Sequence, residues 1–416
     1  MIPPVSLESP DVLLAEIPVR GEPTHADLGS VAIVHDYLNQ PGGAERVVLE
    51  LADVWSDAPI YTSLYRPGST FPEFRRLDIR TSSLDRLPVD RGFRNLFPFY
   101  PGAFRSFGTL EHDVVISSSS GWAHSIPTSP ESFHAVYCHT PARWLYGGEY
   151  LGASRRMAAA EPLLGAVRRW DRRSARRADL YIANSDEVRR RISRQYGIDA
   201  EVVYPPVDVD RFEPSERGER LLVVSRLLPY KRVDVIVDTA TRAGIGLDVV
   251  GTGPALEDLQ RRAGPTVEFH GRLSDTDVTA LMERCRALCL PGKEDFGISP
   301  VEAQAAGKPV IAFAAGGALE TVRDGMTGAF FRRHDPDDVL SAIRRCDLID
   351  TTPEAIAATT RRFSPAAFRA ALLGLLRAGL AARGELALSH RRDVDDGATR
   401  ARRAPADPTT IARTGR

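Results

Sequence analysis

Three features that would restrict the class of protein are scarce or missing in this sequence. The 416 residues include four cysteines and no Cys-x-x-Cys spacing, which argues against a disulfide framework and a structural zinc site. The formal net charge of -1 gives no general attraction to nucleic acid. No apolar run approaches the thickness of a bilayer, and no secretory signal is recognised. We therefore expect a reduced cytoplasmic protein, whose membrane contact would be peripheral, at the inner face of the cell membrane.

The length is sufficient for two domains with flexible ends. We expect a disordered leader at 1–28, an N-terminal domain at 29–204, a linker at 205–217, a C-terminal domain at 218–362, a returning helix at 363–388 and a disordered tail at 389–416. The leader and the tail lack sustained apolar periodicity. Prolines interrupt the pattern at the expected linker.

Short apolar runs recur in both halves, with loops and helical stretches between them. They lie at 30–36, 113–117, 134–138 and 179–183 in the first half, and at 220–226, 247–250, 267–271 and 286–290 in the second. Runs of this kind are typical of buried parallel strands. Their alternation with helices predicts an α/β fold with a doubly wound parallel sheet in each half. Such folds bind ligands at the carboxyl ends of their strands.

The most informative stretch covers residues 291–310, where a strand end, a glycine-containing loop, a short helix and a new strand follow one another. Glu294 and Glu302 bracket the loop, and Phe296, Gly297 and Ile298 offer backbone N–H groups beside the start of the helix. This arrangement suits a phosphate or a cluster of sugar hydroxyls. The same residues also fit a capping box from Ser299 to Glu302, in which Glu302 would only satisfy a backbone donor.

Two cations flank a loop after the strand predicted at 220–226. Arg226 can grip phosphate oxygens in a bidentate manner and Lys231 supplies a point charge, so the pair suits a diphosphate. Gly251 and Gly253 follow the next strand and would let the backbone approach that diphosphate. Leu256 stands where a dinucleotide fingerprint has its third glycine, which argues against an NAD-dependent oxidoreductase.

The stretch at 291–310 closely resembles the donor-sugar motif of retaining glycosyltransferases of family four, which have the GT-B fold. The Glu-x7-Glu spacing, the Phe-Gly pair, the Pro-Val-Glu-Ala helix start and the Gly-Lys-Pro-Val strand all coincide. This resemblance implies two Rossmann-like domains facing across a cleft, the first holding the acceptor and the second the nucleotide sugar. It implies retention of the anomeric configuration and requires neither a metal ion nor another cofactor.

The resemblance also assigns roles to individual residues. Glu294 would hold hydroxyls of the donor sugar and Glu302 those of the ribose. His139, in a Cys-His-Thr-Pro-Ala-Arg sequence, would lie against the sugar near the bond that is exchanged, so His139 and Glu294 are the candidate catalytic residues. The other positions implied to bind the donor are Gly42 and Gly43 in the first half, and Arg226, Lys231, Gly251, Gly253, Arg272, Leu273, Phe296, Gly297 and Ile298 in the second.

The segments at 293–298 and 303–305 resemble mannosyltransferases that make cell-surface polysaccharide or glycolipid, so GDP-mannose is favoured over a UDP-hexose as donor. The acceptor is expected to be a saccharide or a lipid-linked saccharide. Two other functions remain open. A sugar-nucleotide epimerase would change the donor without using an acceptor. A non-catalytic nucleotide-sugar-binding protein would bind the donor without releasing diphosphate.

Three further segments invite a functional interpretation. Asp208 and Asp210 have the spacing of metal ligands, but they lie in the proline-rich linker and we reject a metal site there. The arginine-rich stretch at 155–177 predicts a solvated helix packed on the sheet, with binding to anionic lipid as a secondary possibility. The aromatic region at 66–107 is expected to serve core packing, with an acceptor-facing or membrane-facing surface as the alternative.

Overall fold

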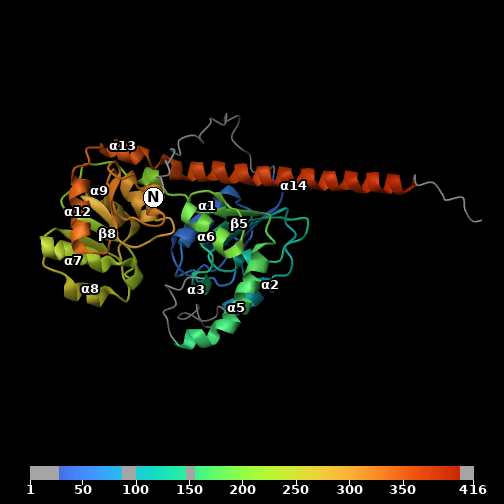
Figure 1. Ribbon diagram of the computed structural model, residues 1–416, viewed down its shortest axis with the longest axis horizontal. Helices are drawn as coiled ribbons and strands as arrows, with labels where there is room; N and C mark the ends of the chain where they lie inside the picture. The colour runs from blue at the N-terminus through green and yellow to red at the C-terminus, as the bar shows by residue number, and fades with distance from the viewer. Residues whose placement is uncertain (1–27, 87–99, 147–154, 403–416) are drawn as a thin grey trace, which may run out of the picture.

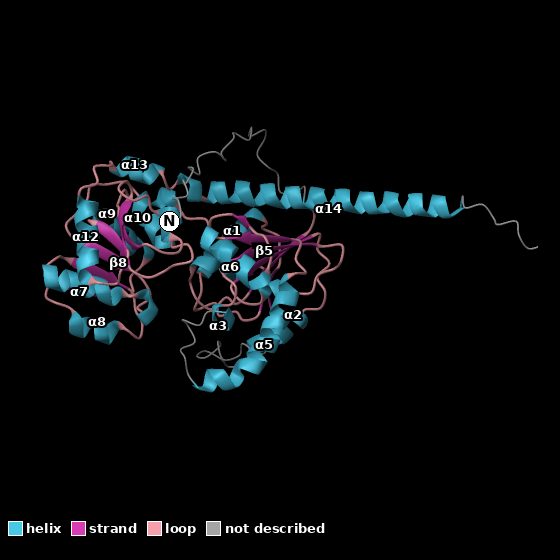
Figure 2. Ribbon diagram, viewed as in Figure 1, coloured by secondary structure: helices cyan, strands magenta, loops and turns pink. Residues whose placement is uncertain are grey.

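The computed structural model describes residues 28–86, 100–146 and 155–402, with backbone alone beyond residue 384. The expected leader thus lies outside the described residues except for its last residue, Leu28. Two parallel sheets, each covered by helices, form the two halves of the molecule (Figures 1 and 2). The predicted α/β class with a doubly wound sheet in each half is confirmed.

The first sheet has seven strands in the order β3-β2-β1-β4-β5-β6-β7. Their bounds are β1 Val31–His35, β2 Ile60–Thr62, β3 Ile79–Thr81, β4 Val114–Ser119, β5 Phe133–Cys138, β6 Leu180–Ala183 and β7 Glu201–Val202. The second sheet has six strands in the order β10-β9-β8-β11-β12-β13. Their bounds are β8 Leu221–Val224, β9 Leu247–Val250, β10 Val267–Gly271, β11 Ala287–Leu290, β12 Val310–Phe313 and β13 Gly328–Phe331.

The helices of the described chain are α1 Gly43–Val54, α2 Tyr100–Arg105, α3 Arg143–Tyr146, α5 Arg155–Ala175, α6 Asp186–Tyr196, α7 Val233–Ala243, α8 Leu256–Arg262, α9 Asp275–Arg284, α10 Ile298–Ala305, α11 Ala318–Thr321, α12 Pro336–Asp347, α13 Pro353–Ala358 and α14 Pro365–Arg402. Helix α6 shows how local sequence sets the bounds. The Ser185 hydroxyl accepts a hydrogen bond from the Val188 amide at 3.1 Å, and Gly197 ends the helix with a φ of 64°. These are the preferred residues for the two ends of a helix.

The strand order reverses at one point in each sheet. In the first sheet β1 lies between β2 and β4, and in the second β8 lies between β9 and β11. At such a point, the loops that follow two neighbouring strands (β1 and β4, or β8 and β11) turn to opposite faces of the sheet. This opens a crevice at the carboxyl edge. The sequence places His139 and the Gly42–Gly43 loop at this edge of the first sheet, and Lys231 and Glu294 at this edge of the second.

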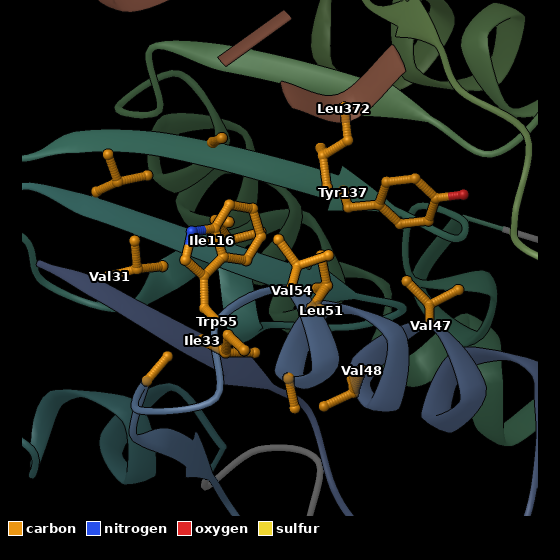
Figure 3. Close-up of a cluster of buried hydrophobic side chains, with 14 of the residues drawn as sticks. Val31, Ile33, Val47, Val48, Leu51, Val54, Trp55, Ile116, Tyr137 and Leu372 are labelled. Atoms are coloured by element: carbon orange, nitrogen blue, oxygen red, sulfur yellow. The ribbon is translucent and has the colours of Figure 1, made fainter. Parts of the chain in front are cut away.

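The core of the first domain joins segments that are far apart in the sequence. Figure 3 shows Val47 and Leu51 of α1, Tyr137 of β5 and Leu372 of α14 around one cluster. The predicted core role of the aromatic region holds for Tyr100 and Phe104, which are buried among other core side chains. The region's Phe93, Phe97 and Phe99 lie outside the described residues.

The expected linker does not run free of the second domain. Val207, Val209 and Phe212 are buried in a core cluster with Leu222 of β8 and Leu288 of β11. The prolines end the first sheet as expected, but the apolar residues between them anchor the connection to the second domain.

Helix α14 runs along the first domain and continues beyond it (Figure 1). Arg369 binds Glu50 and Asp53 on α1, and Arg383 lies 3.1 Å from Asp179. The helix ends at Arg402, so residues 389–402, expected to be disordered, are helical instead.

The expectation that no apolar run is long enough for a bilayer is also corrected, because residues 353–384 pass that test by length and composition. Four apolar side chains of this segment pack into the first-domain core, namely Phe368, Leu372, Leu373 and Leu376. Its arginines at 369 and 383 are held by acidic side chains of the same domain. The structure therefore uses the segment as a packing helix of the first domain.

Candidate active site

The clearest feature of the second crevice is an ion pair between Lys231 and Glu294. Lys231 ends a short turn after β8, and Glu294 lies in the loop after β11, so the two residues come from the strands that flank the reversal of order. The lysine is 9% exposed and the glutamate side chain 18%. An anion that enters the crevice would share the Lys231 ammonium with Glu294, and the low exposure of the lysine strengthens that attraction.

Glycines allow the loops around Glu294 to pack closely. Gly316 has a φ of 66°, and a Cβ there would collide with the backbone oxygen of Glu294. The amide of Gly317 donates to that same oxygen at 2.9 Å. The loops after β11 and β12 are thus fixed to each other, and they hold Glu294 beside Lys231.

The remaining predicted residues of the β8, β9 and β10 loops are placed differently from one another. Arg226 is exposed, and its charge acts across the crevice on Glu45 of the first domain. A Cβ on Gly251 or Gly253 would collide with backbone of the Arg226 loop. These two glycines therefore serve close packing of backbone on backbone. Arg272 is exposed, whereas Leu273 packs partly against the core, and their roles in binding the donor remain predictions.

Glu302 is held by an ion pair that sequence reasoning missed. Arg211, from the segment between the domains, donates to its carboxylate at 2.8 Å. Burial raises the pKa of Glu302, and the nearby Arg211 opposes that shift. The capping-box interpretation is wrong, because α10 begins at Ile298 with Gly297 as its N-cap and without a side-chain cap. A ligand can donate hydrogen bonds to the Glu302 carboxylate only if it shares that carboxylate with Arg211.

The glycine loop of the first domain touches the donor-motif helix of the second. A Cβ on Gly43 would lie 2.7 Å from Cδ1 of Ile298, so a larger residue there would require the end of the Ile298 side chain to shift. A Cβ on Gly42 would lie 2.6 Å from a carboxylate oxygen of Glu45. The structure thereby brings Gly43 next to Ile298, and a role of Gly42, Gly43 and Ile298 in binding a donor stays a prediction.

Glu45 is a buried carboxyl group that sequence reasoning did not select. It is 1% exposed, and its Oε2 has no hydrogen-bond partner among the residues the structure describes. Burial raises its pKa to about 7, while a hydrogen bond from Gln40 and the charge of Arg226 oppose the shift. The only sequence signal was its place beside the glycine pair.

His139 lies at the carboxyl edge of the first sheet, directly after β5. The residue is 8% exposed, and its Nε2 is 2.8 Å from the hydroxyl of Ser118. Burial lowers the pKa of His139 to about 3, and the neighbouring His35 lowers it further. The ring is therefore neutral near pH 7, which suits a hydrogen-bonding group better than a permanent cation.

Charged residues from the two domains clamp the His139 loop to the Glu294 loop. Asp295 pairs with Arg143, and with Arg191 of α6 at 3.0 Å. Arg191 also donates to the Thr140 hydroxyl at 2.8 Å. These contacts hold the loop of His139 at a fixed distance from the loop of Glu294. Sequence reasoning gave no role to Asp295 or to either arginine.

One group of side chains in the described structure has the composition of a metal site. Asp248, Glu268 and His270 offer ligand atoms within 4.8 Å of one another. Arg220 already binds both carboxylates, at 2.9 Å for Asp248 and 3.1 Å for Glu268. A resident cation partner makes this group a salt-bridge cluster, and it has no part in the crevice.

Comparison with known proteins agrees with this architecture. Residues 41–211 match the family model described as Glycosyltransferase Family 4, and residues 208–362 match that described as Glycosyl transferases group 1. Anabaena Alr3699/HepE, solved in complex with UDP and glucose, has a TM-score of 0.65 at 20% identity, covering 84% of this chain and 100% of that one. Sucrose-phosphate synthase from Thermosynechococcus elongatus also has a TM-score of 0.65, at 18% identity, covering 85% of this chain and 100% of that one.

These matches and the two facing parallel sheets define the class, which is that of GT-B proteins. More narrowly, each half of the chain is similar to a glycosyltransferase family, the first half to the family-four model and the second to the group-one model.

Curated relatives match over shorter stretches. D-inositol 3-phosphate glycosyltransferase of Nocardioides sp. is 29% identical over 222 residues, which are 44% of this chain and 48% of that protein. The protein of the same name from Mycobacterium bovis is 32% identical over 194 residues, 40% of each chain. The match thus spans about half or less of these relatives.

Proposed function

We propose that this protein transfers a hexose from a nucleoside diphosphate sugar to a saccharide or glycolipid acceptor. The observation that carries the proposal is the largely buried ion pair of Lys231 and Glu294 at the strand-order reversal of the second sheet. Negative charge grows on the diphosphate as the glycosidic bond breaks. A fixed ammonium stabilises that state more than the ground state, which is the requirement for catalysis.

The neighbouring groups complete a donor site of the expected chemistry. Glu294 accepts hydrogen bonds from hydroxyls of the hexose, and Arg226 adds a second positive charge for the diphosphate. Glu302 accepts from the ribose once it shares Arg211. Phe296 to Ile298 supply backbone donors at the start of α10.

The reaction we propose retains the anomeric configuration and uses no metal ion. Glu294 and Glu302 both belong to the donor motif, so they are not the facing acid and nucleophile of a retaining hydrolase. The departing phosphate takes the proton of the acceptor hydroxyl. Lys231 and Arg226 provide the positive charge that a divalent cation supplies in other transferases.

We favour GDP-mannose as the donor, on the resemblance of residues 293–298 to mannosyltransferases of cell-surface polysaccharide and glycoconjugate synthesis. The competing donor is a UDP-hexose, because Alr3699/HepE was solved with UDP and glucose. A panel containing both donors, measured by thermal shift, decides between them.

Peripheral binding to the inner face of the cell membrane is the second part of the proposal. Helix α5 buries Leu164 and Ala175 against the domain, as its predicted packing requires, while Arg169, Arg172 and Arg173 are exposed. Exposed arginines on one helix attract anionic lipid head groups. Sedimentation with anionic liposomes at low salt tests this part, and absence of binding eliminates it.

Turnover in the presence of membrane extract tests the activity itself. The transferase proposal is supported if nucleoside diphosphate is released and a labelled product forms. The glycosidic bond of that product, α or β, must have the same anomeric configuration as the donor. Conversion of the nucleotide sugar without any diphosphate release would instead identify an epimerase. Tight binding of the donor with neither reaction would identify a binding protein.

A further inference from the structure

Three polar side chains form a chain of hydrogen bonds at the strand-order reversal of the first sheet. His35 ends β1, Ser118 lies opposite it in β4, and His139 follows β5. His35 Nδ1 is 3.0 Å from the backbone oxygen of Ser118 and 3.1 Å from its hydroxyl oxygen. That hydroxyl oxygen is 2.8 Å from Nε2 of His139. All three residues are buried.

We assign the hydrogens from the hydrogen-bond partners of each atom. A backbone carbonyl oxygen can only accept, so His35 must carry its hydrogen on Nδ1. The Ser118 hydroxyl accepts from this N–H group, and Nε2 of His139 is the acceptor among the described residues that its own hydrogen can reach. A neutral imidazole has one N–H group. His139 therefore carries its hydrogen on Nδ1.

Both rings are held in the neutral form that this assignment needs. Burial lowers the pKa of His35, against the opposing charge of Asp36, and burial lowers that of His139 as well. His35 Nε2, which the assignment leaves without a hydrogen, has no partner among the described residues. An unprotonated nitrogen tolerates this better than an unpaired N–H group, because buried donors are rarely left without a partner.

We propose that Ser118 and His35 are positioning residues that hold His139 as the Nδ1–H tautomer, so that His139 donates a hydrogen bond to a hydroxyl of the transferred hexose. The inference rests on the proposed function for the identity of the acceptor group. Nδ1 of His139 makes no hydrogen bond to any residue the structure describes, whereas its Nε2 is engaged by Ser118. The clamp from Asp295 through Arg191 to Thr140 holds this ring's loop near Glu294.

The same strand supplies a matched control. Ser117, one residue before Ser118, is also fully buried and makes a 2.8 Å hydrogen bond to a histidine, His134 near the start of β5. Alternate residues of a strand face opposite sides of the sheet. Ser117→Ala therefore removes an equivalent serine–histidine contact without touching the ring of His139.

Nitrogen NMR of the full chain with labelled histidine reads the tautomer directly, because protonated and bare ring nitrogens have well-separated shifts. Loss of a signal pair in His139→Gln assigns the ring. We expect Nδ1 to be protonated in the wild type, the Nε2–H form to appear in Ser118→Ala, and no change in Ser117→Ala. A wild-type ring protonated on Nε2, or a tautomer indifferent to Ser118→Ala, overturns the inference.

Donor turnover provides the second readout. Ser118→Ala should lower kcat/KM roughly tenfold to a hundredfold, the effect of leaving one polar group of the site without its hydrogen bond, with Ser117→Ala near wild type. His139→Asn places an amide nitrogen where Nδ1 lies, and His139→Gln places one where Nε2 lies. Asn should therefore retain the higher activity, and a higher activity for Gln contradicts the proposal.

The two readouts separate this inference from the proposed function. A wild type that neither binds nor turns over nucleotide sugars, yet shows the Ser118-dependent Nδ1–H tautomer, refutes the transferase assignment and the role toward the hexose, but not the tautomer. A wild type that transfers hexose while carrying the hydrogen on Nε2 refutes the positioning role and leaves the transferase standing.

Discussion

Substitution of Lys231 by methionine tests the electrostatic basis of the donor site. Methionine keeps an unbranched stem of similar length in a position that is 9% exposed, and it removes the charge. A hydrogen bond to a charged group contributes about 1.5–3 kcal/mol, so the dissociation constant of the donor should rise by roughly 10-fold to 150-fold. The loss should be as large for the free nucleoside diphosphate, because the charge acts on the phosphates and not on the sugar.

Isothermal titration with the donor and with its nucleoside diphosphate measures this effect. Lys293→Met is the control, since Lys293 directly precedes Glu294 in the chain but is 46% exposed and pairs with Glu187 of the first domain at 2.7 Å. Water screens the charge of Lys293, whose side chain is 46% exposed, so the change in donor affinity should stay within about fivefold. Equal effects of the two substitutions, or an unchanged affinity in Lys231→Met, would refute the proposed diphosphate site.

Three more substitutions test other parts of the site. Asp295→Asn should raise KM for the donor and increase amide exchange in its loop, because two arginines lose their shared carboxylate. The control Asp347→Asn, which breaks an ion pair elsewhere, should change neither quantity. Gly316→Ala should cost at least about 2 kcal/mol more in chemical denaturation than Gly325→Ala, since both have positive φ but only the first would collide with backbone. Glu45→Gln should gain stability relative to wild type as pH rises from 4.5 to 7, by about 3 kcal/mol at most. The reason is that the raised pKa of Glu45 makes ionisation of the folded wild type unfavourable. A difference in melting temperature between the two proteins that is independent of pH would contradict this.

Local sequence was sufficient to predict most strands and the positions of the ion-pair partners. Lys231 and Glu294 each follow an apolar run, and parallel strands end at one edge of a sheet, so their proximity follows once the strand order is known. The edge strand β3 gave no such signal, because it has three residues with one apolar side chain, Ile79, and that residue is only partly buried.

Contacts between the two halves could not be predicted from local sequence. Arg191 lies 104 residues before its partner Asp295, in a helix whose other arginines look alike in the sequence. Likewise, Arg211 belongs to a segment that reads as a plain connector, and its ion pair with Glu302 depends on how that segment packs on the second domain. Such pairs are set by the relative placement of the domains, which has no periodic signature.

The two crevices use the same strand-order reversal to present different electrostatics. In the second domain the reversal gathers Lys231 and Glu294, both of which form charge-assisted hydrogen bonds. In the first domain it gathers His35, Ser118 and His139, and burial keeps both rings uncharged. The first-domain arginines nearby, Arg143 and Arg191, are paired with Asp295, so under the proposed function they do not compete with Lys231 for the diphosphate. Neutral hydrogen-bonding groups on that side can orient a hexose while the charge that develops on the leaving group is stabilised on the other side.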